Sequence, residues 1–503
     1  MCKDIPPLLD LLENKYNISI TSCTSILKYP VFRADLSQYK LRLTHRTPII
    51  CVRPEDATEM STQHLAQSLQ DVAREGRFAD ETAIVLLDAQ DQELKEQFKL
   101  FYHRFVVIDS NEQAAIFNSR RPSGAFLDTI SHQVPLLLLS PYETNAYVFG
   151  SQFFGRKLEI NRLMSNPNTN FLITGIRRIG KTSLLKEVKR LMEIKEDANA
   201  PYIVYMDCND YVSNESFIED IVRKLDPRRL VRLGYQNYSF FFPAFLEQMK
   251  KKYKHRIVFF LDEIDQLAEM QTHTNNIFQI LRSASNKEAC QFFVAGYRQA
   301  IRESTTADSP FYNFGVPITL GAFNRADANE LIVKPMEGLR ISLNDREKLV
   351  SRIYHETAGL PNLMQVYCQI LLEELEQSNS RELSEKNLIG VYENFRLHNS
   401  IRTSFLQNTT PAEKLITYAL LKELGLDLSR SFSPQVIDIA LKKQEQIFSQ
   451  ADIESACRTL SYIGFFMRKS NEITFTSPIF AKILVEMNLD YCLMKAKEEY
   501  KNV

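Results

Sequence analysis

Short apolar runs alternate with longer polar segments through the middle of the chain. Five runs rich in β-branched and aromatic residues are each followed by a segment with helical periodicity, and they cover residues 171–175, 202–207, 257–263, 291–296 and 316–321. Strands that alternate with helices are typical of a parallel sheet with helices on both faces. The pattern therefore predicts a three-layer α/β core over residues 147–324.

The first part of the chain repeats this pattern on a smaller scale. Between Thr47 and Ser110 the runs PIICV, TAIVLLDA and RFVVIDS are separated by helix-like segments, which predicts a small parallel sheet. The first 46 residues have mixed patterning and receive no assignment. A stretch with Pro, Asn and Thr at 141–147 reads as a linker, so we expect an N-terminal α/β domain over residues 1–140 that acts as a sensor or effector.

After about Arg325 the strand-like runs stop. Helical periodicity then predicts a helical lid over residues 325–400. A further unit over residues 405–490 has helix-like segments followed by the runs FFMRK and EITFTS, with a turn at Ser470–Asn471 between them. Helices that end in such a hairpin are typical of a winged helix.

Composition narrows the classes of protein. The 503 residues include 61 Lys and Arg and 62 Asp and Glu, so the whole chain offers no basic field to recruit nucleic acid or an anionic membrane. The eight cysteines show no CxxC pair and no zinc-ligand spacing, and we expect them to be reduced thiols. Apolar stretches are too short to span a bilayer and no signal peptide is visible, so we expect a cytoplasmic protein without membrane insertion.

The strongest chemical signal is GIRRIGKT at residues 175–182. It matches GxxxxGK[ST] and lies between an apolar strand and a helix-like segment. In this motif, backbone N–H groups of a glycine-rich turn surround phosphate oxygens at a helix N-terminus. Lys181 is expected to reach the β- and γ-phosphates, and the Thr182 hydroxyl to ligate Mg²⁺. The residues expected to bind ATP are Gly175, Ile176, Arg177, Arg178, Ile179, Gly180, Lys181, Thr182 and Ser183.

The motif completes the predicted fold class. It is α/β, with a three-layer P-loop NTPase core, a helical lid, a C-terminal winged-helix domain and a small N-terminal α/β domain. A chance match to the motif in a glycine turn is the alternative, but the order strand, motif, helix argues against it.

A second signal, IVFFLDEID, places Asp262 and Glu263 at the end of a buried strand. In a parallel sheet that end lies on the same edge as the phosphate loop. Asp262 would then hold the magnesium shell, and Glu263 would polarise the attacking water. An acid-rich helix start explains these residues equally well when they are taken alone, but the phosphate loop upstream favours catalysis. Asp265 fits the structural interpretation, as a first-turn acid.

Five segments in combination resemble one family: FFGRKLEINRL, GIRRIGKTSLL, FLDEIDQL, FFVAGYR and TAGLPNLMQ. They are similar to AAA-like ATPases of the archaeal-type and STAND branch, relatives of the origin-recognition initiator ATPases, over about residues 149–400 and the winged helix. The resemblance implies that the Phe-Gly-Arg element ending at Arg156 lies beside the adenine. It also implies that the Gly-Leu-Pro element ending at Pro361 opens a lid helix against the nucleotide.

The resemblance implies two further arginine roles. The residue that senses the γ-phosphate follows the fourth strand, where this chain has Arg298 rather than a small polar residue, and a surface arginine is the alternative. Arg282 would stabilise charge on the nucleotide of a neighbouring subunit, with a helix-face arginine as the alternative.

Three functions follow as hypotheses. The family resemblance implies an ATP-hydrolysing, STAND-like signalling switch in microbial defence or regulation, whose nucleotide state, ATP or ADP, controls conformation, self-association or contact with a protein partner. The second is a DNA-binding initiator or transcription regulator that uses the winged helix, although its expected recognition helix has few bases. In the third, the N-terminal domain is an enzyme gated by the ATPase, with Asp88 and Asp109 at strand ends, where helix capping is the alternative role.

Overall fold

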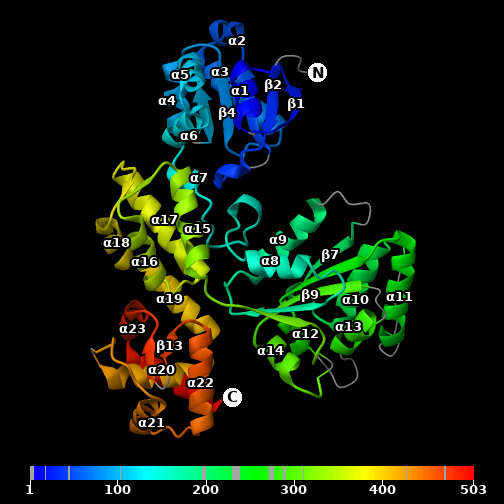
Figure 1. Ribbon diagram of the computed structural model, residues 1–503, viewed down its shortest axis with the longest axis vertical. Coiled ribbons are helices and arrows are strands. Elements are labelled where there is room, and N and C mark those ends of the chain that lie inside the picture. The colour runs from blue at the N-terminus through cyan, green and yellow to red at the C-terminus, as the bar shows by residue number, and fades with distance from the viewer. Residues whose placement is uncertain are drawn as a thin grey trace.

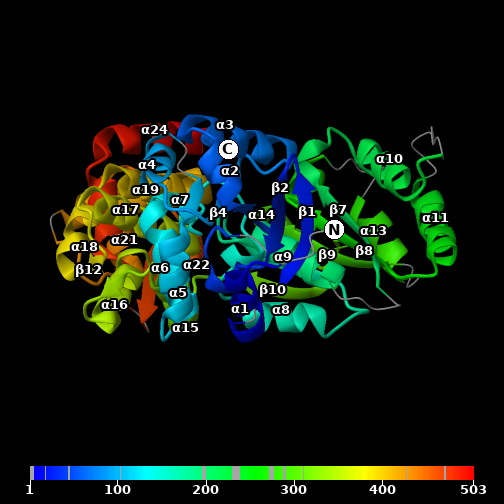
Figure 2. The ribbon, with the colours of Figure 1, turned by 90° about the horizontal axis from the view of Figure 1, so that it is seen from above.

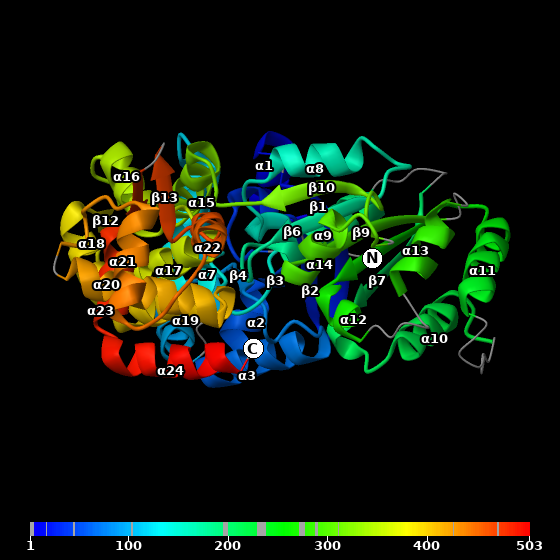
Figure 3. The ribbon, with the colours of Figure 1, turned by 90° about the horizontal axis from the view of Figure 1, so that it is seen from below.

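The computed structural model of the chain describes residues 5–16, 18–43, 46–101, 104–194, 200–228, 238–270, 277–286, 290–309, 311–425, 427–469 and 472–502. The N-terminal part, the helices of the predicted lid and the C-terminal helices follow one another in a column, and the five-stranded core lies beside this column (Figure 1). Views from above and below show the core on one side of the molecule and the lid with the C-terminal helices on the other (Figure 2, Figure 3).

The core is built on a five-stranded parallel sheet, and the strands predicted from the sequence are confirmed. The strands run in the order β10-β6-β9-β8-β7, and every neighbouring pair is parallel. Parallel pairing follows because each strand is joined to the next by a crossover connection. The bounds are β6 (Phe171–Gly175), β7 (Tyr202–Asp207), β8 (Ile257–Asp262), β9 (Cys290–Gly296) and β10 (Val316–Leu320).

Different helices pack on the two faces of this sheet, as neighbouring side chains of one strand show. On β8, Phe260 shares an apolar cluster with α9 (Lys181–Ile194), whereas its neighbour Phe259 packs in a separate cluster with α10 (Asn214–Leu225). Successive strand residues point to opposite faces, so both faces are covered and the three-layer core is confirmed. The remaining helices of this part are α8 (Lys157–Met164), α11 (Tyr238–Tyr253), α12 (Asp265–Glu269), α13 (Ile277–Asn286) and α14 (Arg298–Thr305).

The N-terminal part contains the predicted parallel strands and two more. In the sheet order β1-β2-β3-β4-β5, the last three strands are parallel, whereas β1 and β2 join them through antiparallel pairs. The two added strands lie in the stretch that received no assignment. The strands are β1 (Ile20–Ile26), β2 (Tyr29–Ala34), β3 (Thr47–Val52), β4 (Ala83–Leu87) and β5 (Phe105–Ile108). The helices are α1 (Pro7–Tyr16), α2 (Pro54–Glu59), α3 (Thr62–Glu75), α4 (Gln92–Phe101), α5 (Ser110–Asn118) and α6 (Pro122–Gln133).

Helices dominate after the core, as the periodicity predicts. The lid helices are α15 (Arg325–Gly338), α16 (Arg346–Glu356), α17 (Pro361–Gln377), α18 (Glu385–Tyr392) and α19 (Phe395–Asn408). A short parallel pair, β11 (Ser342–Leu343) with β12 (Glu382–Leu383), lies among them and has no counterpart in the sequence pattern. α17 begins at Pro361, where the fixed φ of proline suits a first helical turn.

The C-terminal helices carry the predicted hairpin. The elements are α20 (Pro411–Leu424), α21 (Pro434–Lys443), α22 (Gln450–Tyr462), β13 (Phe466–Lys469), β14 (Glu472–Phe475), α23 (Pro478–Val485) and α24 (Leu489–Lys501). β13 and β14 pair in antiparallel fashion, and Phe432, before α21, bridges to Ile473 of β14. The order helix, bridge, two helices and hairpin agrees with the pattern from which the winged helix is predicted, and the winged helix itself stays a prediction. The predicted turn residues Ser470 and Asn471 lie outside the described residues, and the domain boundaries stay predictions.

The segment that follows the N-terminal part contacts the lid directly. The hydroxyl of the buried Tyr142, just after α7 (Leu136–Leu139), donates to the carbonyls of Leu331 and Ile332 on α15 at 3.3 and 3.1 Å. One continuous apolar cluster runs from α1 through the lid into the C-terminal helices. The lid is therefore packed to both ends of the chain.

The structure bears on two expectations drawn from composition, namely that the thiols are reduced and that the chain does not enter a membrane. The described free thiols are Cys51, Cys208, Cys290, Cys368, Cys457 and Cys492. Cys23 is disulfide-bonded, so the expectation of reduced thiols is wrong at that residue. Within the described ranges, the helices lack the length and apolar character that crossing a bilayer requires.

Candidate nucleotide-binding site

The phosphate loop joins β6 to α9 through two unusual backbone conformations. Arg178 and Gly180 have φ values of 65° and 100°. A Cβ added to Gly180 would meet no atom within 4 Å, so the loop is open on that side. A Cβ on Gly175 would instead lie 2.7 Å from Cγ2 of Ile179 and 3.1 Å from the carbonyl oxygen of Leu320. The first glycine thus permits close packing, and the second leaves an open cradle where phosphate oxygens fit.

Lys181 places a buried ammonium group at the base of this loop. The residue is 4% exposed, and Nζ donates to the carbonyls of Gly175 and Ile176 at 3.1 and 3.2 Å. Burial lowers the pKa of Lys181, and the negative charges of Glu263 and Asp262 oppose this shift. The site therefore holds a cation close to two carboxylates before any phosphate arrives.

Asp262 and Glu263 stand at the end of β8, as the sequence predicts. Asp262 is 1% exposed; its Oδ1 accepts from the N–H of Glu263 at 3.1 Å and its Oδ2 from the hydroxyl of Tyr205 at 2.8 Å. Glu263 has a φ of 50°. Burial raises the pKa of Glu263, and the charge of Lys181 opposes the change. A carboxylate with a raised pKa accepts a proton more readily, as a general base must.

Asp265 has a structural role, as expected. Its carboxylate accepts from the backbone N–H groups of Tyr297 and Ala300 at 2.5 and 3.0 Å. These bonds fix the start of α14 against the start of α12.

A cavity of about 520 Å³ opens at the phosphate loop. Its walls come from three parts of the chain: loop residues 178–183 with Glu263, the segment 143–148 after the N-terminal part, and the start of α17 with Pro361, Asn362 and Gln365. Phe154 and Arg156 also line it. Its volume suits a ligand of nucleotide size.

Arg156 lies in this wall in a fixed position. It is 6% exposed, its Nη2 donates to the carbonyl of Gly321 at 2.5 Å, and its guanidinium carbon lies 4.8 Å from the centre of the Phe323 ring. The arginine is therefore held against the end of β10 beside the cavity.

The segment expected to be a plain linker forms part of the cavity wall. The N–H of Glu143 donates to Oε1 of Gln365 on α17 at 2.8 Å, and the N–H of Val148 donates to Oγ of Ser183 on α9 at 3.1 Å. The segment is thus pinned to the lid at one end and to the core at the other. The sequence indicates that this segment lies at the nucleotide site only through its position shortly before the Phe-Gly-Arg element.

The two arginines predicted to respond to phosphate make their hydrogen bonds and ion pairs with other parts of the chain. Nη2 of Arg298 forms an ion pair with Oε2 of Glu413 on α20 at 2.7 Å and donates to the carbonyl of Asn408 at 2.6 Å. Nη1 of Arg282, on α13, donates to the carbonyl of Tyr312 at 3.3 Å. Neither is among the residues that line the cavity. The sensor role and the role toward a neighbouring subunit find no support in this arrangement and stay predictions.

Asn408 reaches the phosphate loop, although no sequence motif marks it. Its Oδ1 accepts from the N–H of Arg177 at 2.8 Å, and its carbonyl accepts from the hydroxyl of Tyr297 at 3.1 Å. Asn408 is the last residue of α19 and is 1% exposed. The junction between the lid and the C-terminal helices therefore contacts the loop itself.

The groups at this site fit ATP with Mg²⁺. Gly180 leaves an open cradle for phosphate, and Lys181 supplies a fixed cation. The Thr182 hydroxyl and the Asp262 carboxylate are hard oxygen donors, which Mg²⁺ prefers alongside water and phosphate oxygens. Thr182 lines the cavity, whereas Asp262 is buried and is not among the residues that line it.

Two family models match the central part of the chain. The model described as AAA domain matches residues 166–303, and the model described as Novel STAND NTPase 2 matches residues 236–411. Together the two matches cover residues 166–411, and both models describe P-loop NTPases of the AAA or STAND type. A comparison with curated proteins finds no match.

The chain is similar to solved structures at low sequence identity. The ORC2 protein of Aeropyrum pernix, solved as ADPNP–ADP complexes, has a TM-score of 0.50 and 16% identity, with 71% of this chain and 98% of that chain covered. A Walker-type ATPase of Pyrococcus abyssi has a TM-score of 0.47 and 14% identity, with 69% and 99% covered. At 16% identity, the likeness to the ORC2 protein establishes a shared fold only.

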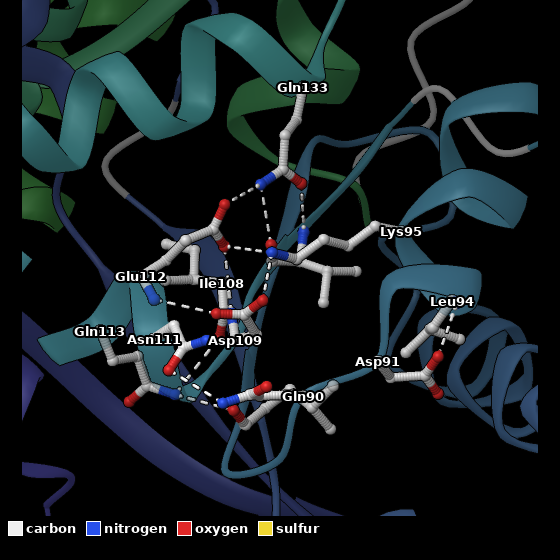
Figure 4. Close-up of polar contacts among 12 residues, drawn as sticks. Gln90, Asp91, Leu94, Lys95, Ile108, Asp109, Asn111, Glu112, Gln113 and Gln133 are labelled. Atoms are coloured by element: carbon white, nitrogen blue, oxygen red, sulfur yellow. Dashed lines mark hydrogen bonds and ion pairs between the residues drawn. The ribbon is translucent and has the colours of Figure 1, made fainter. Parts of the chain in front are cut away.

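Strand-end aspartates in the N-terminal part of the chain have structural partners. Asp109 forms a capping box with Glu112 at the start of α5, and Nζ of Lys95 on α4 contacts the carboxylates of both (Figure 4). Asp88 is exposed and accepts a long bond of 3.4 Å from Gln113. Capping explains Asp109 without a catalytic role.

Lys181→Ala should abolish ATP binding, because it removes the buried cation that would face the phosphates while β6 and α9 stay intact. Binding of a fluorescent ATP analogue measures this. Lys189→Ala, on the same helix and paired with Glu193, is the matched control. A folded Lys181→Ala variant with undiminished affinity would contradict the assignment.

The pKa of Asp109 predicts how acid affects stability. Burial opposes the shift, but hydrogen bonds from Lys95 and from the N–H of Glu112 hold the pKa of Asp109 below its ordinary value. The stabilisation is therefore present above the ordinary carboxyl pKa and is lost as pH falls through the lowered one. Asp109→Asn should lower the unfolding temperature at pH 7, and its difference from the parent chain should shrink toward pH ~3. A constant difference at every pH would contradict this, and Asp88→Asn should change little at either pH.

Proposed function

We propose that this chain is an ATP-binding and ATP-hydrolysing, STAND-like signalling switch, in which the nucleotide state controls conformation or self-association. The observation that carries the proposal is the contact between Asn408 and the N–H of Arg177. Arg177 belongs to the loop that would surround phosphate, and Asn408 belongs to the junction that leads to the C-terminal helices. A ligand that rearranges the loop therefore acts on the junction, and the junction acts equally on ligand affinity.

A second contact supports the same coupling. Arg298 follows β9 and pairs with Glu413, which also caps α20 together with Thr410. The end of β9 is where the family resemblance expects a γ-phosphate sensor. Here the side chain at that position, Arg298, is bound to Glu413 of α20. A nucleotide that moved Arg298 would therefore weaken or strengthen the contact that holds α20.

The proposed reaction uses few groups. Lys181 and the loop N–H groups bind the β- and γ-phosphates, and Glu263 orients a water and accepts its proton. Bound Mg²⁺ would neutralise charge on the phosphate oxygens, held through Thr182 and Asp262. Lid residues such as Pro361 and Gln365 would close the cavity and exclude bulk water. Turnover in a switch of this kind is regulatory and slow.

The DNA-binding alternative has weaker support. α22, in the position of a recognition helix, carries Asp452 and Glu454 near its start, and Arg468 of β13 pairs with Glu454 at 2.7 Å. Acids at this surface would repel phosphate groups of DNA. We therefore favour a protein partner or self-association for this unit, and a cytoplasmic location stays a prediction.

Glu263→Gln should keep nucleotide binding and stall hydrolysis, because an amide no longer accepts the proton from water while Asp262 and Lys181 are unchanged. Phosphate release should fall by at least about 100-fold. Binding and turnover are measured on the same preparation, and Glu269→Gln, at the end of α12, serves as the control. Normal turnover in Glu263→Gln would show that another residue positions the water.

The switch itself is tested by limited proteolysis and by particle mass. Cleavage within residues 141–147 and 400–412 should differ between the ATP-bound and ADP-bound chain, because an opening exposes these segments first. Glu263→Gln keeps the ATP state long enough to be analysed. Identical digestion patterns and identical particle mass in both states would leave a plain ATP-hydrolysing protein and remove the case for a switch.

A further inference from the structure

The hydroxyl of Tyr205 contacts the carboxylate of Asp262 from the neighbouring strand. It donates to Oδ2 at 2.8 Å, while Oδ1 accepts from the N–H of Glu263 at 3.1 Å. Asp262 is 1% exposed. Each oxygen of this buried carboxylate therefore has one donor, which fixes the rotation of the group and leaves its remaining lone pairs in defined directions.

Strand register brings the two side chains to the same face of the sheet. β7 and β8 pair with Tyr205 opposite Phe260 and Asp207 opposite Asp262. Tyr205 packs against the same apolar cluster as Phe260, which is the cluster on the α9 face. Asp262 lies two residues after Phe260 and so points to that face as well. The tyrosine thus approaches Asp262 along the face covered by the helix that carries Thr182.

Lys186 covers the ring of Tyr205 from α9. Its Nζ lies 3.3 Å from the centre of that ring and 5.0 Å from the centre of the Tyr147 ring. Lys186 follows Thr182 by four residues, so the two share one face of the helix. A cation over the ring face restricts the tyrosine. The ring is thereby held between Lys186 and the Asp262 carboxylate.

We propose that Tyr205 is a positioning residue for the magnesium site, whose hydroxyl orients the Asp262 carboxylate toward the metal shell shared with Thr182. Groups that hydrogen-bond a metal-binding side chain commonly change metal affinity by about 10- to 100-fold. The inference rests on the proposed function, since it assumes that ATP binds with Mg²⁺ at this loop. A tyrosine that merely joined β7 to β8 would affect stability and leave the metal requirement unchanged.

Tyr205→Phe tests this with the full-length chain. The variant keeps the ring and its contact with Lys186 but removes the hydroxyl. Binding of a fluorescent ATP analogue is titrated with Mg²⁺ and compared with binding in EDTA. The Mg²⁺ concentration for half-maximal binding should rise by about 10-fold, and affinity in EDTA should stay at the parent value.

Tyr211→Phe is the matched control. The hydroxyl of Tyr211 donates to Oδ2 of Asp220 at 2.7 Å, so this variant also removes a tyrosine–aspartate bond, but away from the residues that line the cavity. Its Mg²⁺ requirement should equal that of the parent. Thermal unfolding of each variant without nucleotide checks that both are folded.

Two results would overturn the inference. One is an unchanged Mg²⁺ requirement in Tyr205→Phe, and the other is an equal loss of affinity with Mg²⁺ and in EDTA, which indicates a general structural role. A parent chain that binds the analogue under neither condition would instead overturn the proposed function, and with it this inference.

Discussion

The buried ammonium group of Lys181 is the constraint on which the site depends. A charge that is 4% exposed needs partners, and it finds two loop carbonyls and the nearby carboxylates of Glu263 and Asp262. Those carboxylates stand two strands away from the loop, at the end of β8, because the sheet order is β10-β6-β9-β8-β7. The carboxylate of Asp262 is buried in turn and is satisfied by Tyr205 from β7. The charge balance at one residue thus links the ends of three strands.

Three parts of the chain together form the cavity beside this charge. The core supplies the phosphate loop, the segment 143–148 supplies a second wall, and the start of α17 supplies a third. The segment is tied to α17 through Gln365 and to α9 through Ser183. A ligand in the cavity would contact parts that lead to the N-terminal sheet and to the lid, so its binding energy is available to shift how these parts sit together. Asn408 adds the junction to the C-terminal helices.

Local patterns explain what the sequence could predict. The five core strands, GIRRIGKT and the pair Asp262–Glu263 are each set by residues adjacent in the chain, whose periodicity and strand-end position suffice. Asn408 and Tyr205 form hydrogen bonds to residues 231 and 57 positions away in the chain, and no local pattern encodes such bonds. β1 and β2 could not be predicted because apolar and polar residues do not alternate clearly in their sequences. The position of Arg298 after the fourth strand predicts a contact with the γ-phosphate. In the structure Arg298 pairs instead with Glu413, which is distant in the sequence but close in the fold.

The central claim is that the phosphate loop and the junction at Asn408 respond to one ligand, and amide hydrogen exchange tests it most directly. Exchange of peptides covering residues 400–412 is compared in the nucleotide-free, ADP-bound and ATP-bound chain, with the buried helix α23 as the internal reference. The account predicts that exchange at the junction differs between the ADP and ATP states while α23 stays unchanged. Equal exchange at 400–412 in both nucleotide states, with nucleotide bound, would contradict it.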